Sequence, residues 1–381
     1  MRIAIITLTG GGMSGGYRKY LRNVLPRMAS NPAVEAVLCA SPGSLNVHDW
    51  FDPISNVSFV SCRPFRFLHY SSDSQLRGDL EKFLPDVIFV PVERSFVFEK
   101  IPVVKMIQNM EPFVSNGDGN PVSERFREWV QYIDAKRAIK KADGVIALSN
   151  FVSNFLVSCW KIPNEKIGLV YHGIDVVMND DAERPHVILK NWEGRFFFTA
   201  GSIRPARGLE DLLMAMKHLS LQGEKSFRLV IAGEAGLSMV GYQKKLRDWA
   251  QENKLLDRIC WAGNLSQREM KWCYQNCSAF IMTSRVESFG MIGGEAMSYG
   301  CTCISADNPC LPELFGDAAI FYPPRDEKSL ARAIKFVLSL DDNQRKVMSE
   351  KARKRAAKFS WDICAEKTVK VLAKAVKNSI K

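Results

Sequence analysis

The sequence predicts an α/β protein with two doubly wound parallel-sheet domains that face each other across a cleft. Short apolar runs alternate with amphipathic helical patterns along the whole chain, which is typical of parallel sheets. The apolar runs are continuous, as in strands that helices cover on both faces. The alternation stops once, at Val176–Gly194, and then restarts, which indicates a domain boundary. Ligands of such sheets bind at the carboxyl ends of the strands, so we expect the site in the cleft.

The first domain is predicted to span residues 1–175 and to bind the acceptor of whatever reaction the chain performs. Its expected strands are Ile3–Leu8, Val34–Ala40, Val57–Ser61, Val87–Pro91, Val103–Ile107, Val145–Leu148 and Ile167–Tyr171. Helical patterns lie between several of these runs, for example Tyr17–Met28 and Glu124–Lys141.

The second domain is predicted to span residues 176–360. Polar residues and Pro185 interrupt the pattern at its start, so we interpret Val176–Gly194 as the linker. The strands expected after the linker are Phe196–Ala200, Leu229–Ala232, Ile259–Trp261, Ala279–Thr283, Thr302–Ser305 and Ala319–Tyr322.

The last segment, residues 361–381, is predicted to be a basic amphipathic helix that packs back on the first domain. An apolar stripe runs beside a basic stripe at helical spacing: Ala365, Val369, Leu372, Val376 and Ile380 beside Lys367, Lys370, Lys374, Lys377 and Lys381. Residues 325–381 hold 16 Lys and Arg against 7 Asp and Glu, so most of the net charge of +11 lies there. A solvated lysine face and contact with an anionic membrane surface both fit this pattern.

Composition places the chain among ordinary globular proteins. It has 381 residues, of which 46% are hydrophobic and 24% charged, and this excludes disordered and disulfide-scaffold classes. No apolar run reaches about 18 residues, so no membrane span is expected. The ten scattered cysteines fit a reducing compartment and lack the spacing of a zinc site. Basic residues are not interleaved with aromatic ones, so nucleic acid is not an expected partner. We therefore expect a cytoplasmic protein without a metal.

The first motif is glycine-rich and follows the first strand. Gly10, Gly12 and Gly15 form G-x-G-x-x-G, and Gly16 follows, just before a predicted helix. Glycines at this place let the backbone approach a phosphate at a helix N-terminus. A nicotinamide-binding fold needs an acid at the end of the second strand, but that strand ends Cys39-Ala40-Ser41-Pro42. The motif therefore indicates a phosphate-approaching loop of another kind.

The second motif opens the second domain. Strand Phe196–Ala200 leads into the loop Gly201–Gly208, which carries Arg204 and Arg207. Two guanidinium groups on a loop at the carboxyl end of a strand suit a diphosphate, which they can bind through paired hydrogen bonds. Two solvated arginines are the alternative, which the flanking glycines disfavour.

The third motif is the most specific. It places two glutamates eight residues apart in the string E-S-F-G-M-I-G-G-E-A, with Glu287 in a loop and Glu295 in the helix that follows. Gly290 permits a tight turn, and the backbone N–H groups from Phe289 to Ile292 can point at an anion. Carboxylates beside such a turn accept hydrogen bonds from the hydroxyls of sugars or ribose. Ordinary helix capping is the alternative for a single glutamate.

Taken together, these motifs resemble those of retaining glycosyltransferases of the GT-B fold, family 4, in which both domains are Rossmann-like. The loop Gly201–Gly208 resembles the phosphate loop of that family, although the family usually has Lys where Arg207 stands. Further segments that fit are His172–Asp175, Trp261–Ser266, Leu311–Ala319 and Phe359–Trp361. The resemblance covers nearly the whole chain.

The resemblance implies a role for each matching residue. Glu287 would hold the transferred sugar and Arg204 and Arg207 the diphosphate, as the catalytic set. Glu295 would hold the ribose. The donor would also be bordered by Phe289, Gly290, Met291, Ile292, Gly263, Leu265, Gly15 and Gly16. Gln108 and Asn109 would lie on the acceptor side, with Gln108 where the family often has His, beneath the loop Asn109–Asn120 that carries Glu111, Phe113 and Asp118.

The family implies transfer of a hexose with retention, without a cofactor or metal, from a UDP- or GDP-sugar. The expected acceptor is a glycan or a lipid-linked glycan, in the synthesis of a cell-surface polysaccharide or lipopolysaccharide. A cytoplasmic enzyme at the inner face of the cell membrane would fit this role. Two alternatives stay open: a catalytically weak member that acts as a binding or scaffold protein, and a nucleotide-sugar epimerase. Gln108 stands where the family often has His, which leaves the binding or scaffold protein open. The lack of a His or Asp cluster disfavours the epimerase.

Overall fold

The computed structural model describes residues 1–10, 13–65, 73–98, 100–114, 119–175, 182–192, 196–224 and 226–379. Gly11 and Gly12 of the glycine motif, Asp118, residues 176–181 and 193–194 of the expected linker, and Ile380 and Lys381 of the expected last helix lie outside this description. The chain divides into two compact units. Unit 1 comprises Met1–Phe113, Phe126–Gly173 and Phe359–Lys381, and unit 2 comprises Val114–Arg125 and Ile174–Lys358.

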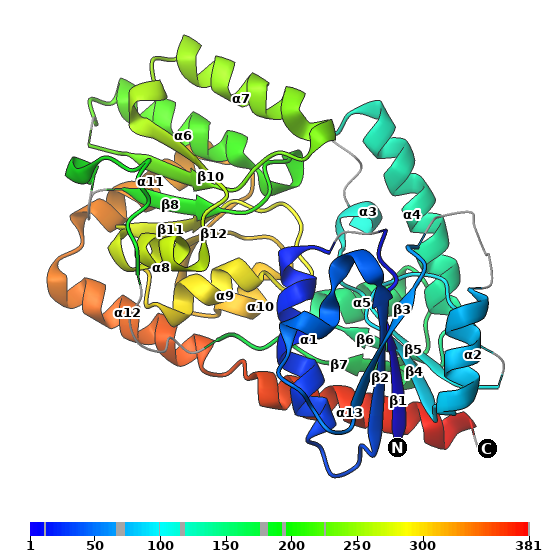
Figure 1. Cartoon of the computed structure of the whole chain (residues 1–381). Helices are drawn as coiled ribbons and strands as arrows, with labels where there is room; N and C mark the ends of the chain where they lie inside the picture. The colour runs from blue at the N-terminus through cyan, green and yellow to red at the C-terminus, as the bar shows by residue number, and fades with distance from the viewer. Residues whose placement is uncertain are drawn as a thin grey trace. The chain divides into compact units, whose positions relative to one another are not determined.

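Unit 1 is built on a seven-stranded sheet with the order β3-β2-β1-β4-β5-β6-β7, in which all neighbouring strands are parallel (Figure 1). Its strands are β1 (Arg2–Ile6), β2 (Ala36–Pro42), β3 (Val57–Cys62), β4 (Val87–Val90), β5 (Val103–Met106), β6 (Gly144–Ala147) and β7 (Ile167–Leu169). Its helices are α1 (Gly15–Ala29), α2 (Ser74–Phe83), α3 (Glu111–Val114), α4 (Val122–Lys140), α5 (Asn150–Ser158) and α13 (Trp361–Ser379), although the first residues of α4 and the last of α3 group with unit 2.

Unit 2 is built on a six-stranded parallel sheet with the order β10-β9-β8-β11-β12-β13. Its strands are β8 (Phe197–Ala200), β9 (Leu229–Ala232), β10 (Ile259–Gly263), β11 (Ala279–Met282), β12 (Cys303–Ala306) and β13 (Ala319–Tyr322). Its helices are α6 (Leu209–Leu221), α7 (Val240–Glu252), α8 (Gln267–Asn276), α9 (Met291–Ser298), α10 (Leu311–Phe315), α11 (Glu327–Ser339) and α12 (Asp342–Ala356).

The fold class predicted from the sequence is confirmed in both units: each is a doubly wound parallel sheet. The expected apolar runs all form strands. Those inside each sheet are buried on both faces, as Val87–Val90 in β4 and Leu229–Ala232 in β9 illustrate, whereas the edge strands β3, β7, β10 and β13 are partly exposed. The ends differ by one or two residues. Leu8, for example, is buried but lies beyond β1, which ends at Ile6 because the ladder to the neighbouring strands stops there.

The strand order creates one reversal in each sheet. In unit 1 the chain runs from β1 to β2 and β3 on one side, and β4 begins the other side. In unit 2 it runs from β8 to β9 and β10, and β11 begins the other side. The loops that follow the two strands at such a reversal run to opposite sides of the sheet. They therefore open a crevice at the carboxyl ends of the strands. The loops after β1 and β4, and after β8 and β11, are therefore where each unit can hold a ligand.

Helix α13 returns to unit 1 and completes its core. It lies along α1 and contacts β4, β5, β6 and β7 (Figure 1). The face turned to the sheet is buried: Trp361, Cys364, Ala365, Thr368, Val369, Leu372 and Ala375. Lys367, Lys370, Lys374 and Lys377 are exposed; Lys370 pairs with Glu366 (2.6 Å), and the ammonium of Lys374 donates to the Glu165 carbonyl (2.6 Å).

The start of α13 encloses a buried histidine. The His172 ring lies 5.1 Å from the Tyr20 ring and 5.9 Å from the Trp361 ring, centroid to centroid. The next residue must be glycine, because a Cβ on Gly173 would lie 2.4 Å from the Trp361 side chain. Burial lowers the pKa of His172 from its ordinary 6.5 to about 3. The imidazole is therefore neutral in the folded protein.

This pKa predicts an acid-sensitive unit 1. The unfolded chain takes up the His172 proton near pH 6.5, whereas the folded chain resists protonation until about pH 3. The contribution of His172 to stability is therefore fully present above pH 6.5 and is lost as the pH falls, by about 1.4 kcal/mol per pH unit. Urea unfolding at pH 7.5 and pH 5.0 should show a drop of about 2 kcal/mol that His172→Phe removes. The exposed His48 supplies the control, since His48→Gln should keep the drop; an equal drop in the His172 variant would contradict the prediction.

Candidate functional site

In unit 2, Gly201 and Gly208 let the loop after β8 lie close to the ends of the neighbouring strands β9 and β11. The Gly201 N–H donates to the Ala232 carbonyl (3.0 Å) at the end of β9. Gly208 has φ +62°, and a Cβ there would lie 2.4 Å from the Thr283 carbonyl oxygen after β11. The Thr283 hydroxyl donates to the Arg207 carbonyl (2.6 Å). The loops after β8 and β11 thus touch at the reversal of the sheet.

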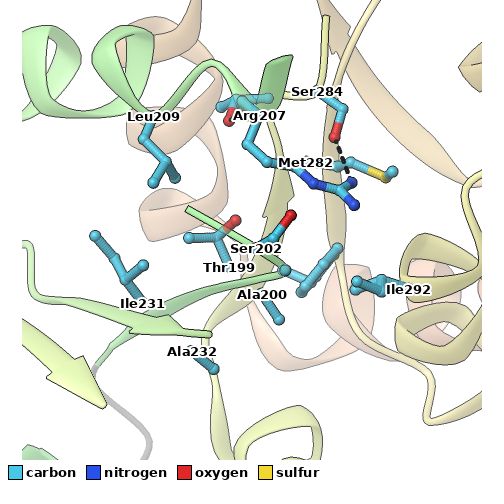
Figure 2. A pocket seen from close by; sticks show the side chains of 13 residues that line it. Thr199, Ala200, Ser202, Arg207, Leu209, Ile231, Ala232, Met282, Ser284 and Ile292 are labelled. Carbon is cyan, nitrogen blue, oxygen red and sulfur yellow. Dashed lines mark hydrogen bonds between the residues drawn. The ribbon is translucent and has the colours of Figure 1, made fainter. Parts of the chain in front are cut away.

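Arg207 and Glu287, both predicted as catalytic, meet at this contact. The Arg207 Nη1 donates to the Glu287 Oε1 and to the Ser284 hydroxyl, the latter at 3.2 Å (Figure 2). Their side chains are 25% and 15% exposed, so the ion pair is shielded yet open to a ligand. Arg204 lies three residues earlier, at the start of the turn Pro205–Arg207, and its carbonyl accepts the Arg207 N–H (2.9 Å).

A second ion pair, between Arg285 and Asp211, also connects the segments that follow β8 and β11. The Arg285 guanidinium donates to both carboxylate oxygens of Asp211, at 2.8 and 3.3 Å, and the Arg285 N–H donates to the Ala206 carbonyl (2.8 Å). Asp211 is in the first turn of α6, is 3% exposed and also accepts the Arg325 N–H (3.0 Å). Bidentate, buried pairs of this kind are the strong ones, so the loop that carries Glu287 is held in one position.

The first turn of α9 follows Glu287, and no side chain caps its N–H groups. Gly290, at φ +93°, precedes the helix, no side chain caps the helix start, and the first turn holds no acidic residue. Gly293 lets the helix lie close to α10, because a Cβ there would be 2.6 Å from the Phe315 ring. Phe289 is buried at 2% exposure, whereas Met291 and Ile292 are half-buried. The positive end of the helix is therefore available to an anion.

Glu295 lies one turn further along α9, where Tyr274 of α8 holds it. The Tyr274 hydroxyl donates to the Glu295 Oε2 (3.3 Å), and its ring stacks on Tyr299 at 5.3 Å. Burial, and then the charge of Glu295, raise the pKa of Tyr274 well above its ordinary 10. The phenol therefore stays protonated and fixes one oxygen of the carboxylate. Tyr274 was not among the predicted site residues, because a tyrosine in the middle of a helix carries no sequence signal.

A pocket opens beside these groups, over the carboxyl ends of β8, β9 and β10. It encloses about 820 Å³ including its mouth, and its lining comprises Ala200, Gly201, Ser202, Ala232, Gly233, Glu234, Ala235, Gly236, Asn264, Leu265, Met270 and Ile292. A smaller pocket next to it, which also reaches Ile292, is lined by Arg207 and Ser284 (Figure 2). The predicted Leu265 lines the larger pocket, and the predicted Gly263 accepts the Gly233 N–H (2.6 Å) at its rim. Glu234 and Asn264 were missed.

The predicted residues of unit 1 lie beyond the carboxyl ends of two of its strands, β1 and β5. Gly15 and Gly16 begin α1, whose N-cap Ser14 accepts the Tyr17 N–H (3.3 Å). A Cβ on Gly15 would meet no atom within 4 Å. Packing within the protein therefore does not require a glycine at this position, which fits a backbone that a ligand approaches.

Gln108 and Asn109 follow β5 and are joined to the loop after β4. The Gln108 N–H donates to the Glu93 Oε2 (3.0 Å), and the Gln108 side-chain amide donates to the Met106 sulfur (3.2 Å). The Asn109 side-chain oxygen accepts the Glu111 N–H (3.0 Å). Burial raises the pKa of Glu93 above its ordinary 4.5. Glu93 was missed too, although it follows an expected strand directly.

The predicted site residues therefore form two sets. Unit 2 brings Arg207 and Glu287 into contact, places Leu265 and Ile292 on one pocket, and sets Glu295 on the helix beside it. Unit 1 holds Gly15 and Gly16 after β1, and Gln108 and Asn109 after β5, which is separated from β1 by β4. The larger pocket, the adjoining pocket with Arg207 and the first turn of α9, which no side chain caps, can together bind a nucleoside diphosphate that carries a sugar.

Comparison with known families shows the family to which the chain belongs. Residues 14–177 match the model described as Glycosyltransferase Family 4, and residues 180–355 match Glycosyl transferases group 1. The chain is a glycosyltransferase of the GT-B fold. One after the other, the two models span this glycosyltransferase from α1 to the end of α12.

Curated relatives of the glycosyltransferase include two O-antigen chain mannosyltransferases. The O-antigen chain mannosyltransferase B of Escherichia coli is 22% identical over 250 residues, 64% of each chain. The O-antigen chain mannosyltransferase RfbU of Salmonella typhimurium is 24% identical over 207 residues, 54% of each chain. The matched stretch thus spans less than two thirds of the length of these relatives.

Solved structures share the fold of the glycosyltransferase over its whole length. The structure of Anabaena Alr3699/HepE in complex with UDP-glucose superposes with a TM-score of 0.75 at 17% identity, covering 98% of this chain and 99% of that one. That of WaaG, a glycosyltransferase involved in lipopolysaccharide biosynthesis, gives a TM-score of 0.67 at 12% identity, covering 97% of this chain and 99% of the other.

Two kinds of feature are absent from the described part of the glycosyltransferase. Among the residues that the structure describes, no helix is both long and apolar enough to cross a bilayer. Within the same residues, no three or more His, Cys, Asp or Glu side chains gather as ligands for a metal ion.

Proposed function

We propose that the chain is a retaining hexosyltransferase that moves a sugar from a nucleotide-sugar to a glycan or lipid-linked acceptor during the synthesis of a cell-surface polysaccharide. The observation that carries this proposal is the contact of Arg207 with Glu287 beside an open pocket at the reversal of the unit 2 sheet. Because the curated relatives quoted above are mannosyltransferases, mannose is the first sugar to test.

The leaving diphosphate is the group that catalysis must stabilise. Arg204, Arg207 and the first-turn N–H groups of α9 supply positive charge and donors that are already in position. Such preorganised groups stabilise charge as it develops on the leaving oxygen. In this proposal the two arginines provide the charge that a metal ion provides elsewhere, so no metal cofactor is assigned.

The two glutamates bind hydroxyl groups. Glu287 is held by Arg207 and would accept hydrogen bonds from the transferred sugar. Tyr274 fixes one oxygen of Glu295 and leaves the carboxylate able to accept bonds from the ribose. Gln108 cannot act as an imidazolium acid, which favours positioning and electrostatics over proton transfer by that residue.

The acceptor is assigned to unit 1, and an anionic membrane surface is a proposed partner. Gly15 and Gly16 follow β1 at the reversal of the unit 1 sheet, and Gln108 and Asn109 follow β5, so a ligand of that unit would bind at these carboxyl ends. The exposed lysines of α13 support weak contact with anionic lipid at the inner face of the membrane, while the buried apolar face of α13 is unavailable for insertion.

Hydrolysis of donors without an acceptor tests the proposed function. Incubated with a panel of UDP- and GDP-sugars in EDTA, the wild type should slowly release the nucleoside diphosphate from one of them. Loss of hydrogen bonds to a charged group weakens binding about tenfold to hundredfold, so Glu295→Ala should raise KM for that donor by this factor.

The control is Glu350→Ala, on the exposed face of α12, which should behave as wild type. Release that is unaffected by Glu295→Ala would contradict the role of this residue. No release and no thermal shift with any donor would favour the binding or scaffold protein instead.

A further inference from the structure

The larger pocket of unit 2 contains a carboxylate that none of the roles above uses. Glu234 lies two residues after β9 and lines the pocket, and its side chain is exposed. The side-chain amide nitrogen of Asn264, which follows β10, donates to the Glu234 Oε2 (2.8 Å). β9 and β10 are neighbours in the sheet, so the two side chains lie on adjacent strand ends.

The backbone beneath this pair is fixed. The Gly233 N–H donates to the Gly263 carbonyl (2.6 Å), and a Cβ on Gly233 would lie 2.0 Å from the Gly201 carbonyl oxygen. The Glu234 carbonyl accepts the Ile203 N–H (3.0 Å), which ties the residue to the loop that carries Arg204 and Arg207. Leu265, Met270 and Ile292 supply apolar surface around the same pocket. A flat aromatic ring can therefore be enclosed while its edge meets the Glu234–Asn264 pair.

The hydrogen-bonding pattern of this pair is specific. An amide nitrogen carries two hydrogens, and Asn264 uses one of them on Glu234, so the edge presents one donor followed by two carboxylate acceptors. The Watson–Crick edge of guanine presents the complementary series: the O6 acceptor, the N1–H donor and the N2–H donor. Uracil presents an acceptor, one donor and a second acceptor, which would face a carboxylate oxygen. Adenine presents a donor beside an acceptor.

We propose that Glu234 and Asn264 read the base of the donor and select a guanosine diphosphate sugar over its uridine counterpart. This inference rests on the proposed function, because it assigns the larger pocket to the base of the nucleotide-sugar. A carboxylate that binds the two N–H groups of guanine as a fork is charge-assisted and geometrically selective. A mismatched base leaves a polar group of the pocket unpaired, which is the principal source of such discrimination.

Nucleotide binding measured by calorimetry tests the assignment with three probes: GDP, UDP and inosine diphosphate, which lacks only the N2 amino group of GDP. Wild type should bind GDP at least about tenfold more tightly than either of the others, since a bidentate contact discriminates by about that factor or more. Glu234→Gln should weaken GDP about tenfold, leave UDP within about twofold and abolish the preference for GDP over inosine diphosphate. Because Glu234 is exposed, this variant should fold normally, which thermal melting checks.

Glu252→Gln, at the exposed end of α7, is the matched control and should keep the wild-type preference. UDP binding as tight as GDP, or a Glu234 variant that weakens both nucleotides equally, would overturn the assignment of the base while the proposed function stands. Binding of none of the three nucleotides by folded wild type would overturn the proposed function, and this inference with it.

Discussion

Arg207→Ala is expected to lower kcat/KM for glycosyl transfer by about a thousandfold, mostly through kcat. Removing a preorganised cation that faces a leaving phosphate costs catalysis about 10² to 10⁵ in comparable enzymes. The substitution also leaves Glu287, whose side chain is only 15% exposed, without its ion-pair partner. Steady-state kinetics with the donor found by the hydrolysis panel would measure the effect.

Arg207→Lys separates charge from geometry. A lysine keeps the positive charge but lacks the further guanidinium N–H groups that lie beside the Nη1 bonds to Glu287 and Ser284, so we expect a loss of about tenfold. Arg332→Ala, an exposed arginine on α11, is the control and should retain wild-type rates. A variant at position 207 that changes KM alone would show that Arg207 binds the substrate without stabilising the transition state.

Gly233→Ala is expected to destabilise unit 2 by about 3–5 kcal/mol. The residue has φ +117°, a conformation that side chains rarely adopt, and its Cβ would lie 2.0 Å from the Gly201 carbonyl oxygen. The loop after β8 would have to move away, and the hydrogen bond from the Gly233 N–H to the Gly263 carbonyl would be disturbed. Urea unfolding monitored by tryptophan fluorescence would measure the loss.

The control for that experiment lies in the same unit. Gly241 is in the first turn of α7, with no atom within 4 Å of an added Cβ, so Gly241→Ala should leave stability unchanged or raise it by up to about 1 kcal/mol. A Gly233 variant that unfolds together with wild type would show that the loop can rearrange at no cost.

The sequence was sufficient to predict the fold class because its signal is local. A run such as Val87–Pro91 is apolar at every position, and only a strand covered on both faces has that requirement. The exact ends of strands are less predictable, since they depend on where the neighbouring strand stops pairing. Strand order is not local either: that β8 lies beside β11 follows from the fold and not from any single segment.

In the candidate site, too, local sequence motifs were predictable, whereas contacts that depend on the fold were not. Arg207 and Glu287 could be singled out because each stands in a motif, but their ion pair depends on the adjacency of two loops far apart in sequence. Glu234 stands in no motif, and Asn264 lies in the matching segment Trp261–Ser266 without having been singled out; only the pairing of β9 with β10 brings the two together. Tyr274 acquires its role from the helix opposite it.

The return of α13 to unit 1 has a consequence for synthesis of the protein on the ribosome. Unit 1 needs Phe359–Lys381 as well as the first half of the chain, whereas all of unit 2, including Val114–Arg125, has been made once Lys358 has emerged. Until α13 arrives, Tyr20 and His172 lack the Trp361 ring that encloses them. Although its sequence is made first, unit 1 is therefore the last to finish folding, and a nascent chain that stalls before Trp361 would present an incomplete apolar surface to chaperones.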